Sequence, residues 1–306
     1  SDHSSDIIRA LEKELKKAGV QIHLNTKVKE LQFHDDHVEG VILDHGKVLE
    51  ADAVIIATGG LSYPATGSTG DGYRFAEEFG LKVTECCPSL VPFNVREDWV
   101  KELQGLSLKN VSILIKDGKK KLFSDFGEMM FTHFGVTGPL ILTASSVCAR
   151  KIREKEVKLY LDLKPALTKE QLDARILREF DANANKQFRN VLPSFLPSKL
   201  VSVMYELCGI APEKRIHDIT KEERERFLSC LKELELTVTG LRGYNEAIIT
   251  KGGVSVKEID PSTMESKTVP GLYFIGEVLD LDAVTGGFNL QIAWSTAVAA
   301  ANAATE

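Results

Sequence analysis

The stretch ADAVIIATGG (residues 51–60) carries the pattern that decides the fold. Its Val54, Ile55 and Ile56 form a short apolar run that leads into small residues, as a central parallel strand covered on both faces does. The segment LYFIGE (residues 272–277) has the same design. In an α/β sheet the carboxyl ends of such strands form the ligand crevice, and glycine lets a ligand approach the main chain. The two segments together predict a ligand site at these ends, although buried strands also end at glycine for packing alone.

A glycine-rich loop opens the last helix, one short connection after the second of these strands. Its residues are Gly286, Gly287, Phe288, Asn289, Leu290 and Gln291. At a helix start, unpaired backbone N–H groups and the positive end of the helix dipole face the preceding loop. That setting suits a group that becomes anionic on reduction, such as the N1–C2=O edge of a flavin, and Glu277 could accept hydrogen bonds from ribityl or ribose hydroxyls. The alternative is a structural helix start in which Asn289 is the cap.

The amino-terminal part predicts a helix followed by β-structure. Ser5 or Asp6 can cap a helix that runs to about Ala18, and its apolar spacing predicts a surface helix with one buried face. VQIHL (residues 20–24) then predicts a strand. The runs VKELQF, VEGVIL and KVLEA, broken by turn-forming residues such as the aspartates at 35–36, predict a small β-meander.

The middle of the chain has a different pattern. From residue 88 to about 162 it contains β-like runs such as VSILI and EVKLYLDL, together with the glycine-rich stretch FGEMMFTHFGVTGPLIL. From about residue 168 to 234 helical composition predominates, with Thr168 as one cap and Thr220 with Glu223 as a capping box. Strand patterns return in LELTVTG and EAIITKGGVSV. We expect an inserted, mostly β domain with a small helical subdomain.

The composition bounds the class of protein. With 306 residues, 43% of them hydrophobic and 27% charged, the chain is long enough for two or three folded domains. A formal net charge of −6 gives no general attraction to phosphate backbones or anionic lipid, so a nucleic-acid partner is not expected. The lysines at 116–121 flank an Asp-Gly hairpin turn and are interpreted as solvated charge. Neither an apolar run of ~20 residues nor a signal peptide is recognisable, which predicts no membrane contact and a cytoplasmic location.

The cysteines and histidines have no metal-site pattern. The five cysteines include no CxxC pair, and the seven histidines show no HxxxH spacing. We therefore predict structural thiols and no metal ion. The neighbours Cys86 and Cys87 are a redox-active alternative, although a disulfide between adjacent residues closes a strained ring.

Several polar side chains are candidates for substrate contact, but no catalytic acid or base is identified. His133, with Thr132 and Thr137 nearby, either donates protons to a substrate or, as we favour, fixes its glycine-rich loop through hydrogen bonds. Ser62 and Tyr63 follow the ATGG turn and either reach the active site or belong to an ordered turn.

Three long blocks of the chain resemble a known family. They are ATGGLSYPATGSTGDGYRFAEEFG (residues 57–80), GEMMFTHFGVTGPLIL (residues 127–142) and IGEVLDLDAVTGGFNLQIAWSTAVAAA (residues 275–301). In content and order they are similar to the bacterial HI0933-like, BaiN-type flavoproteins, which are NAD(P)/FAD-dependent oxidoreductases. The resemblance extends over essentially the whole chain.

The resemblance implies an α/β protein in which an FAD/NAD(P)-binding Rossmann-type domain is interrupted by a mixed β-barrel and a small helical subdomain. The implied boundaries are 1–87 and 266–306 for the FAD-binding domain, 88–163 and 236–265 for the barrel, and 164–235 for the helical subdomain. It also implies that FAD lies along Thr58, Gly59, Gly60, Gly276, Glu277 and the loop at 286–291.

The chain departs from the family pattern in one large respect. Such proteins begin with a strand and a GxGxxG turn that holds the pyrophosphate, and no GxGxxG occurs in this sequence. We expect that the βαβ unit carrying this turn, about 30 residues, is missing, and that the chain alone binds FAD weakly or not at all. The helix at Asp6 and the strand at Val54 should then show exposed apolar surface, which would allow self-association.

The leading functional hypothesis is a flavoenzyme that takes hydride from NAD(P)H onto FAD and delivers it to a reducible small molecule. A second hypothesis is a flavin-dependent protein that modifies nucleic acid, for which salt-dependent RNA binding would be diagnostic. A third is a non-enzymatic interaction module with a structural flavin, which would show no turnover with NAD(P)H.

Overall fold

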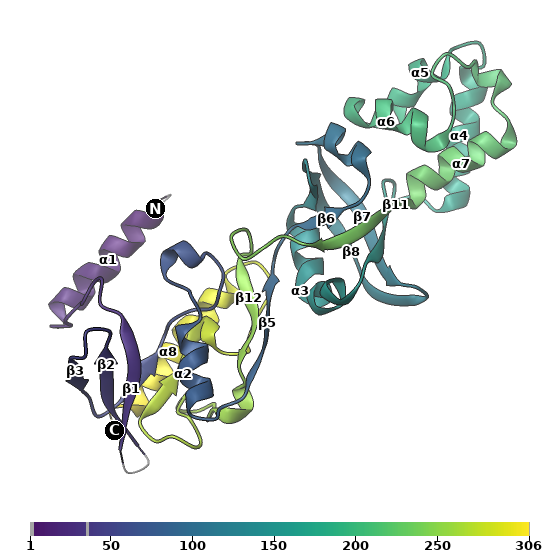
Figure 1. Cartoon of the computed structure of the whole chain (residues 1–306). Helices are drawn as coiled ribbons and strands as arrows, with labels where there is room; N and C mark the ends of the chain where they lie inside the picture. Colours follow the sequence, from purple (N-terminus) through teal and green to yellow (C-terminus); the bar gives the residue numbers. More distant parts are fainter. Residues whose placement is uncertain (1–2, 35–36, 306) are drawn as a thin grey trace.

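A computed structural model describes residues 3–34 and 37–305 of the chain. Within these residues the molecule consists of three parts in a row: a Rossmann-type part, a β-barrel and a bundle of helices (Figure 1). Both ends of the chain belong to the Rossmann-type part, so the barrel and the bundle are inserted into it. The predicted α/β fold class with a barrel and a helical insert is confirmed, whereas the domain boundaries stay a prediction.

The Rossmann-type part is built around a short parallel strand pair. β4 (Val54–Ile56) and β13 (Leu272–Phe274), both predicted as strands, pair with each other in parallel. The helices α2 (Asp71–Glu78) and α8 (Phe288–Ala303) follow the two strands. On its other side β4 has no strand neighbour among the described residues, and Ile55 is 39% exposed. The expectation that β4 is central and covered on both faces was therefore wrong.

An antiparallel meander precedes β4, as predicted. It consists of β1 (Val28–His34), β2 (His37–Leu43) and β3 (Val48–Glu50) in that order. The turn-forming aspartates at 35–36 lie outside the described residues. Residues 20–24 form no strand, contrary to the prediction, because their backbone finds no strand to pair with in the described part of the chain.

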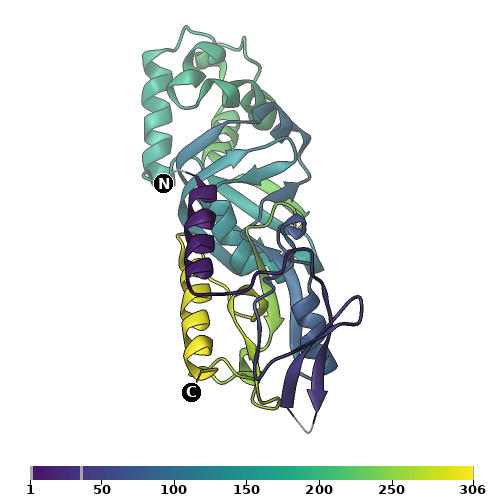
Figure 2. The same cartoon turned by 90° about the vertical axis from the view of Figure 1, so that its left-hand side faces the viewer.

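Helix α1 (Ser4–Lys17) lies at the outside of the molecule (Figure 2). Its apolar stripe is exposed. It begins before the predicted caps, and its N-cap residue, His3, makes no side-chain capping bond. None of its residues is buried, and Ile8 is 63% exposed, so the predicted buried face is wrong. The expectation of exposed apolar surface at α1 and β4 is confirmed. Self-association through this surface stays a prediction.

The barrel strands close in the order β10-β11-β6-β9-β8-β7. Their bounds are β6 (Phe93–Val95), β7 (Ser107–Asp117), β8 (Lys120–Phe131), β9 (Gly135–Thr137), β10 (Val157–Asp162) and β11 (Leu234–Leu241). Inward-pointing apolar side chains of these strands form one continuous core with the helical bundle. Because every second residue of a strand faces this core, the residues between them lie on the outer barrel face.

Helix α3 (Pro139–Glu154), which packs on β8 and β11, was not predicted. The run GPLIL was interpreted as part of the β domain because short apolar runs do not distinguish strand from helix. Pro139 at the first helical position and the apolar spacing of Leu140, Ala144 and Cys148 were the available signals.

The helical bundle caps one end of the barrel (Figure 1). Its helices are α4 (Lys169–Ala182), α5 (Phe188–Val191), α6 (Ser198–Cys208) and α7 (Lys221–Lys232). The predicted caps are confirmed, because Thr168 and Thr220 accept backbone N–H bonds from the third residue of α4 and α7 and each completes a capping box.

A two-stranded antiparallel ribbon, β5 (Val83–Ser89) with β12 (Ile249–Val254), leads from the Rossmann-type part to the barrel. Arg153 of α3 ties the barrel to this ribbon by donating to the carbonyl oxygen of Cys86 at 3.0 Å. The 3-10 helices of the described residues are η1 (Pro64–Thr66), η2 (Asp98–Leu103), η3 (Leu192–Ser194), η4 (Ile216–Asp218), η5 (Val256–Glu258) and η6 (Gly276–Val278). Among the described helices, none has the length and apolar character to cross a membrane.

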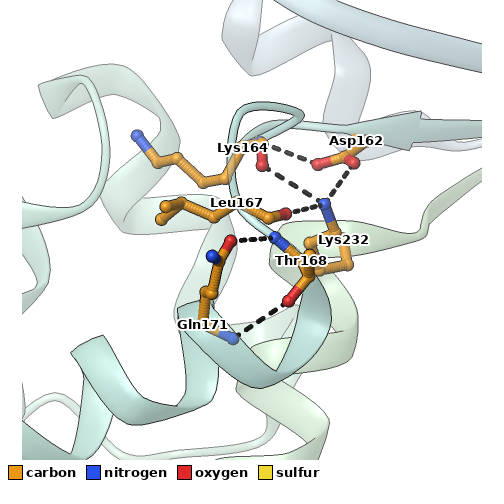
Figure 3. Close-up of polar contacts among 6 residues, drawn as sticks. All are labelled: Asp162, Lys164, Leu167, Thr168, Gln171 and Lys232. Atoms are coloured by element: carbon orange, nitrogen blue, oxygen red, sulfur yellow. Dashed lines mark hydrogen bonds and ion pairs between the residues drawn. The ribbon is translucent and has the colours of Figure 1, made fainter.

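One lysine closes the junction between barrel and bundle (Figure 3). The Lys232 ammonium group, at the end of α7, donates to the Asp162 carboxylate at the end of β10. It also donates to the carbonyl oxygens of Lys164 at 3.2 Å and Leu167 at 2.7 Å. These bonds fix the connection between β10 and α4, so they set the position of the bundle on the barrel.

Candidate cofactor-binding groove

The turn that follows β4 approaches other main chain and side chains very closely. Gly59 has φ +71°, which favours glycine. A Cβ on Gly60 would lie 2.4 Å from Thr250 Oγ1 and 2.7 Å from Glu277 Oε1. Thr58 precedes them at the strand end. Only glycine fits at position 60 without moving the neighbouring residues.

Thr250 of β12 is the residue around which this turn is organised. Its hydroxyl oxygen accepts backbone N–H bonds from Leu61 at 2.7 Å and Ser62 at 3.1 Å. Its own backbone N–H donates to Glu277 Oε1 at 2.8 Å. The contact therefore joins the end of β4, the ribbon and the residue that follows β13. The prediction for Glu277 concerned ribose hydroxyls, and this internal bond uses one of its carboxylate oxygens.

Glu277 lies in a poorly hydrated position. Burial raises the pKa of its carboxyl group, and the hydrogen bonds from Thr250 oppose that rise. A carboxylate kept in such a place without an opposite charge lowers the stability of the folded chain, and this is the pattern of a residue retained for binding.

Replacing Glu277 with glutamine is expected to stabilise the chain at pH 7 and to have little effect near pH 4. Because the folded-state pKa is raised, the folded chain holds this proton more tightly than the unfolded chain, so the contribution of Glu277 to stability falls as pH rises from about 4.5 through the raised pKa. Glutamine is neutral at both pH values and keeps an acceptor for Thr250. Urea unfolding at the two pH values measures the effect, with exposed Glu102→Gln as control; a destabilised Glu277→Gln chain at pH 7 would contradict it.

The start of α8 presents unpaired backbone donors. Gly286 and Gly287 have φ +117° and +86°, and Gly287 is the N-cap. The N–H groups of residues 288–290 have no acceptor among the described residues, and that of Gln291 is the first to bond, to Gly287 O at 3.0 Å. Asn289 does not cap the helix as the structural alternative required: its amide bonds the N–H and the carbonyl of Ala283, each at 2.9 Å.

Hydrogen bonds join the elements that carry the predicted residues. The Gly276 N–H donates to Thr296 Oγ1 of α8 at 3.0 Å, which joins the end of β13 to the helix. Through Thr250, Glu277 is joined to the turn at Thr58–Gly60. The glycine-lined strand ends and α8, whose first N–H groups are free, are thus joined by hydrogen bonds; we call this set of residues the flavin groove, and its donors match the pyrimidine edge and the hydroxyl chain of a flavin. Thr250 and Thr296 were missed by sequence reasoning.

Known proteins resemble this chain over almost its whole length. The family model of the HI0933-like protein Rossmann domain matches residues 1–303. The chain belongs to the HI0933-like family. The resemblance inferred from the three sequence blocks is thereby confirmed.

Proteins with two different names are similar in sequence to this chain. It is 35% identical to the ribosomal RNA dihydrouridine synthase of Haemophilus influenzae, over 97% of this chain and 72% of that protein. It is 33% identical to the protein of the same name from Escherichia coli, over 98% of this chain and 72% of that protein. It is 30% identical to the 3-dehydro-bile acid delta(4,6)-reductase of Clostridium scindens, over 100% of this chain and 74% of that protein. One of these relatives is thus named as a reductase.

The residues that were candidates for substrate contact differ in their exposure and in their hydrogen bonds. Thr132, not His133, fixes the glycine-rich loop, because its hydroxyl accepts the N–H groups of Phe134 and Gly135. The His133 ring is exposed and has no hydrogen bond within the described residues, so the favoured loop-fixing role was wrong. Tyr63 is half-exposed and is held at φ +52° by the bond of its N–H to Tyr244 O at 3.0 Å. Such a strained residue is typical of a functional site.

The described residues contain neither a redox-active cysteine pair nor a metal site. Cys86 and Cys87 are successive residues of β5, so their side chains point to opposite faces, which excludes the redox pair. Burial raises the pKa of both thiols, which favours the unreactive protonated form. No group of three or more His, Cys, Asp or Glu side chains in the described residues could hold a metal ion.

Proposed function

We propose that the chain is the catalytic part of an FAD-dependent reductase that saturates a carbon–carbon double bond conjugated with a carbonyl group, with NAD(P)H as electron donor. The names of the two kinds of relative support this reaction class. Formation of dihydrouridine saturates the C5–C6 bond of uracil, which is conjugated with the C4 carbonyl. A delta(4,6)-reductase acting on a 3-oxo bile acid reduces double bonds conjugated with a carbonyl in the same way.

The observation that supports the cofactor assignment is that the glycine-lined strand ends are joined to α8, a helix whose first N–H groups are free. Bound FAD would supply the hydride. The N–H groups of residues 288–290 would face its pyrimidine edge, Gly60 and Gly276 would let it approach the main chain, and the free oxygen of Glu277 would accept from its hydroxyls. Since the sequence contains no GxGxxG turn for the pyrophosphate, we propose that this chain alone has low affinity for FAD.

We propose uracil in ribosomal RNA as the first substrate to test. The net charge of −6 gives the whole chain no general attraction to nucleic acid, but the charges are unevenly distributed along the sequence. Residues 91–250, which form the barrel and the bundle, contain 26 Lys and Arg against 22 Asp and Glu, whereas the remaining residues contain 12 against 22. The inserted part is therefore the basic part of the molecule, and a polyanion would be attracted to it.

The second candidate substrate is a small conjugated ketone. The relative that acts on a bile acid favours it, since that similarity extends over 100% of this chain. Such a substrate would need only the groove and the adjacent Tyr63, and no contact with the outer barrel face.

A reduction and reoxidation experiment distinguishes the candidates. The chain is saturated with excess FAD and reduced with NAD(P)H without oxygen, and the flavin absorbance is followed after substrate is added. We expect ribosomal RNA to restore the oxidised spectrum and to gain two hydrogens at a uridine by mass spectrometry. Restoration by a steroid enone and not by RNA would favour the small-molecule reaction. If the FAD spectrum is unchanged by the chain at every concentration, the flavin assignment fails.

A further inference from the structure

Two adjoining hollows lie on the outer face of the barrel, where the connection between β10 and α4 crosses it. One, of about 510 Å³, is lined by Lys116, Tyr160 and Lys169 among others. The other, of about 530 Å³, is lined by Phe126, Lys164 and Arg175 among others, and shares this connection. We call these six lining residues the barrel–helix surface. None of them belongs to the flavin groove.

The strand pleat explains why these side chains face outward. In β10, Leu159 and Leu161 point into the core, so Tyr160 between them points out. In β7, Ile115 points inward and Lys116 outward. Phe126 of β8 is 57% exposed, a large apolar side chain on an otherwise polar barrel face. A half-buried tyrosine and an exposed phenylalanine thus lie among cationic side chains. The two carboxylates that line the first hollow are Asp162, which bonds Lys232, and Glu233.

The cations of this face are available for an external anion. Lys116 Nζ lies 5.2 Å from the centre of the Tyr160 ring, within the range of a cation–π contact. Within residues 3–34 and 37–305, no carboxylate lies within 4.0 Å of Lys116, Lys121 or Lys169. Asp117, the acid of the nearby hairpin turn, is bound instead by Lys151 and Lys155. If the lysines at 116–121 were only solvated charge, the position of the aromatic rings beside them would have no explanation.

We propose that the barrel–helix surface binds a single-stranded segment of the RNA substrate, an inference that rests on the RNA function proposed above. Unpaired bases stack on exposed aromatic rings, while lysines and arginines contact the phosphates between them. Tyr160 and Phe126 would stack bases, and Lys116, Lys169 and Arg175 would bind the backbone. The surface would hold the RNA while a separate uridine enters the groove.

The test is binding of a fluorescently labelled single-stranded RNA to the full chain, which needs no flavin. Tyr160→Ala with Phe126→Ala is expected to weaken binding about tenfold or more, as loss of stacking does. Lys116→Gln with Lys169→Gln is expected to weaken it and to lower the salt dependence, the slope of log K against log salt changing by about 1.4 for two phosphate contacts. Lys13→Gln with Lys47→Gln removes the same charge from exposed positions in the Rossmann-type part and serves as the matched control.

The outcomes separate this inference from the function on which it rests. If the unmodified chain binds RNA and the aromatic and lysine variants bind as tightly as the control, the surface is wrong while the RNA function stands. If the unmodified chain binds no RNA at low salt, both are overturned. Preference for duplex RNA, or for an acidic protein over single-stranded RNA, overturns the assigned partner. Unchanged urea midpoints would show that the variants are folded.

Discussion

Replacing Lys232 with alanine is expected to destabilise the helical bundle by about 2–3 kcal/mol, because it leaves several acceptors unpaired at once. The ammonium group bonds the Asp162 carboxylate and the carbonyl oxygens of Lys164 and Leu167 (Figure 3). The side chains of Lys232 and Asp162 are only 14% and 19% exposed, so water replaces the lost bonds poorly. The connection between barrel and bundle would lose its fixed geometry.

The matched control for this change is Lys158→Ala on the same barrel. Lys158 also bonds a carboxylate, that of Glu235, but the two side chains are 43% and 47% exposed. A pair of this kind contributes about 0–1 kcal/mol. Urea unfolding and hydrogen exchange of the α7 amides measure the difference. Equal effects of the two variants would show that the junction is no more than a surface ion pair.

A double variant tests whether the unpaired Asp162 carboxylate causes the loss of stability. In Lys232→Ala with Asp162→Asn, the uncompensated carboxylate is gone, so the chain should recover part of the stability lost in Lys232→Ala alone. If the double variant is less stable than the single one, the loss arises from packing of the lysine stem instead.

The predictions that succeeded depend on short-range signals. The parallel pair β4 and β13 was recognised because each is an apolar run that ends at glycine, and the caps Thr168 and Thr220 because a capping box lies within four residues. The predictions that failed needed knowledge of a distant partner. Residues 20–24 have strand composition but no strand to pair with, and the apolar stripe of α1 is exposed, with no buried face, in the part of the chain that the structure describes.

The residues of the groove show the same difference between local signals, which the sequence reveals, and contacts with distant residues, which it does not. Its glycines were recognisable from residue type, because the need for a left-handed backbone or a close approach is a property of the position itself. Thr250 was not recognisable, since it lies 189 residues from Leu61, whose N–H it accepts. The capping alternative for Asn289 could not be decided for a similar reason: a cap and a loop clamp use the same residue type, and only the position of Ala283 decides between them.

Replacing Gly60 with alanine is expected to destabilise the Rossmann-type part by about 2–4 kcal/mol and to abolish flavin binding. The added methyl group would lie 2.6 Å from Thr250 Cβ, an atom fixed by its strand and unable to swing away as a long side chain can. Thr250 would have to move, and its hydroxyl would then release the N–H groups of Leu61 and Ser62. Urea unfolding and FAD titration measure the two effects.

The control and a double-mutant cycle make the cause of this loss testable. Gly243→Ala adds the same methyl group where no atom lies within 4 Å and φ is not left-handed, so it should be nearly neutral. Thr250→Gly alone should destabilise the chain by loss of its hydroxyl bonds. In the combination Gly60→Ala with Thr250→Gly the clash with Thr250 is absent, and only the contact with the end of the Glu277 side chain is left, so the double variant should cost clearly less than the two single changes together. Strict additivity would mean that the two residues do not meet, and the groove could not then depend on their contact.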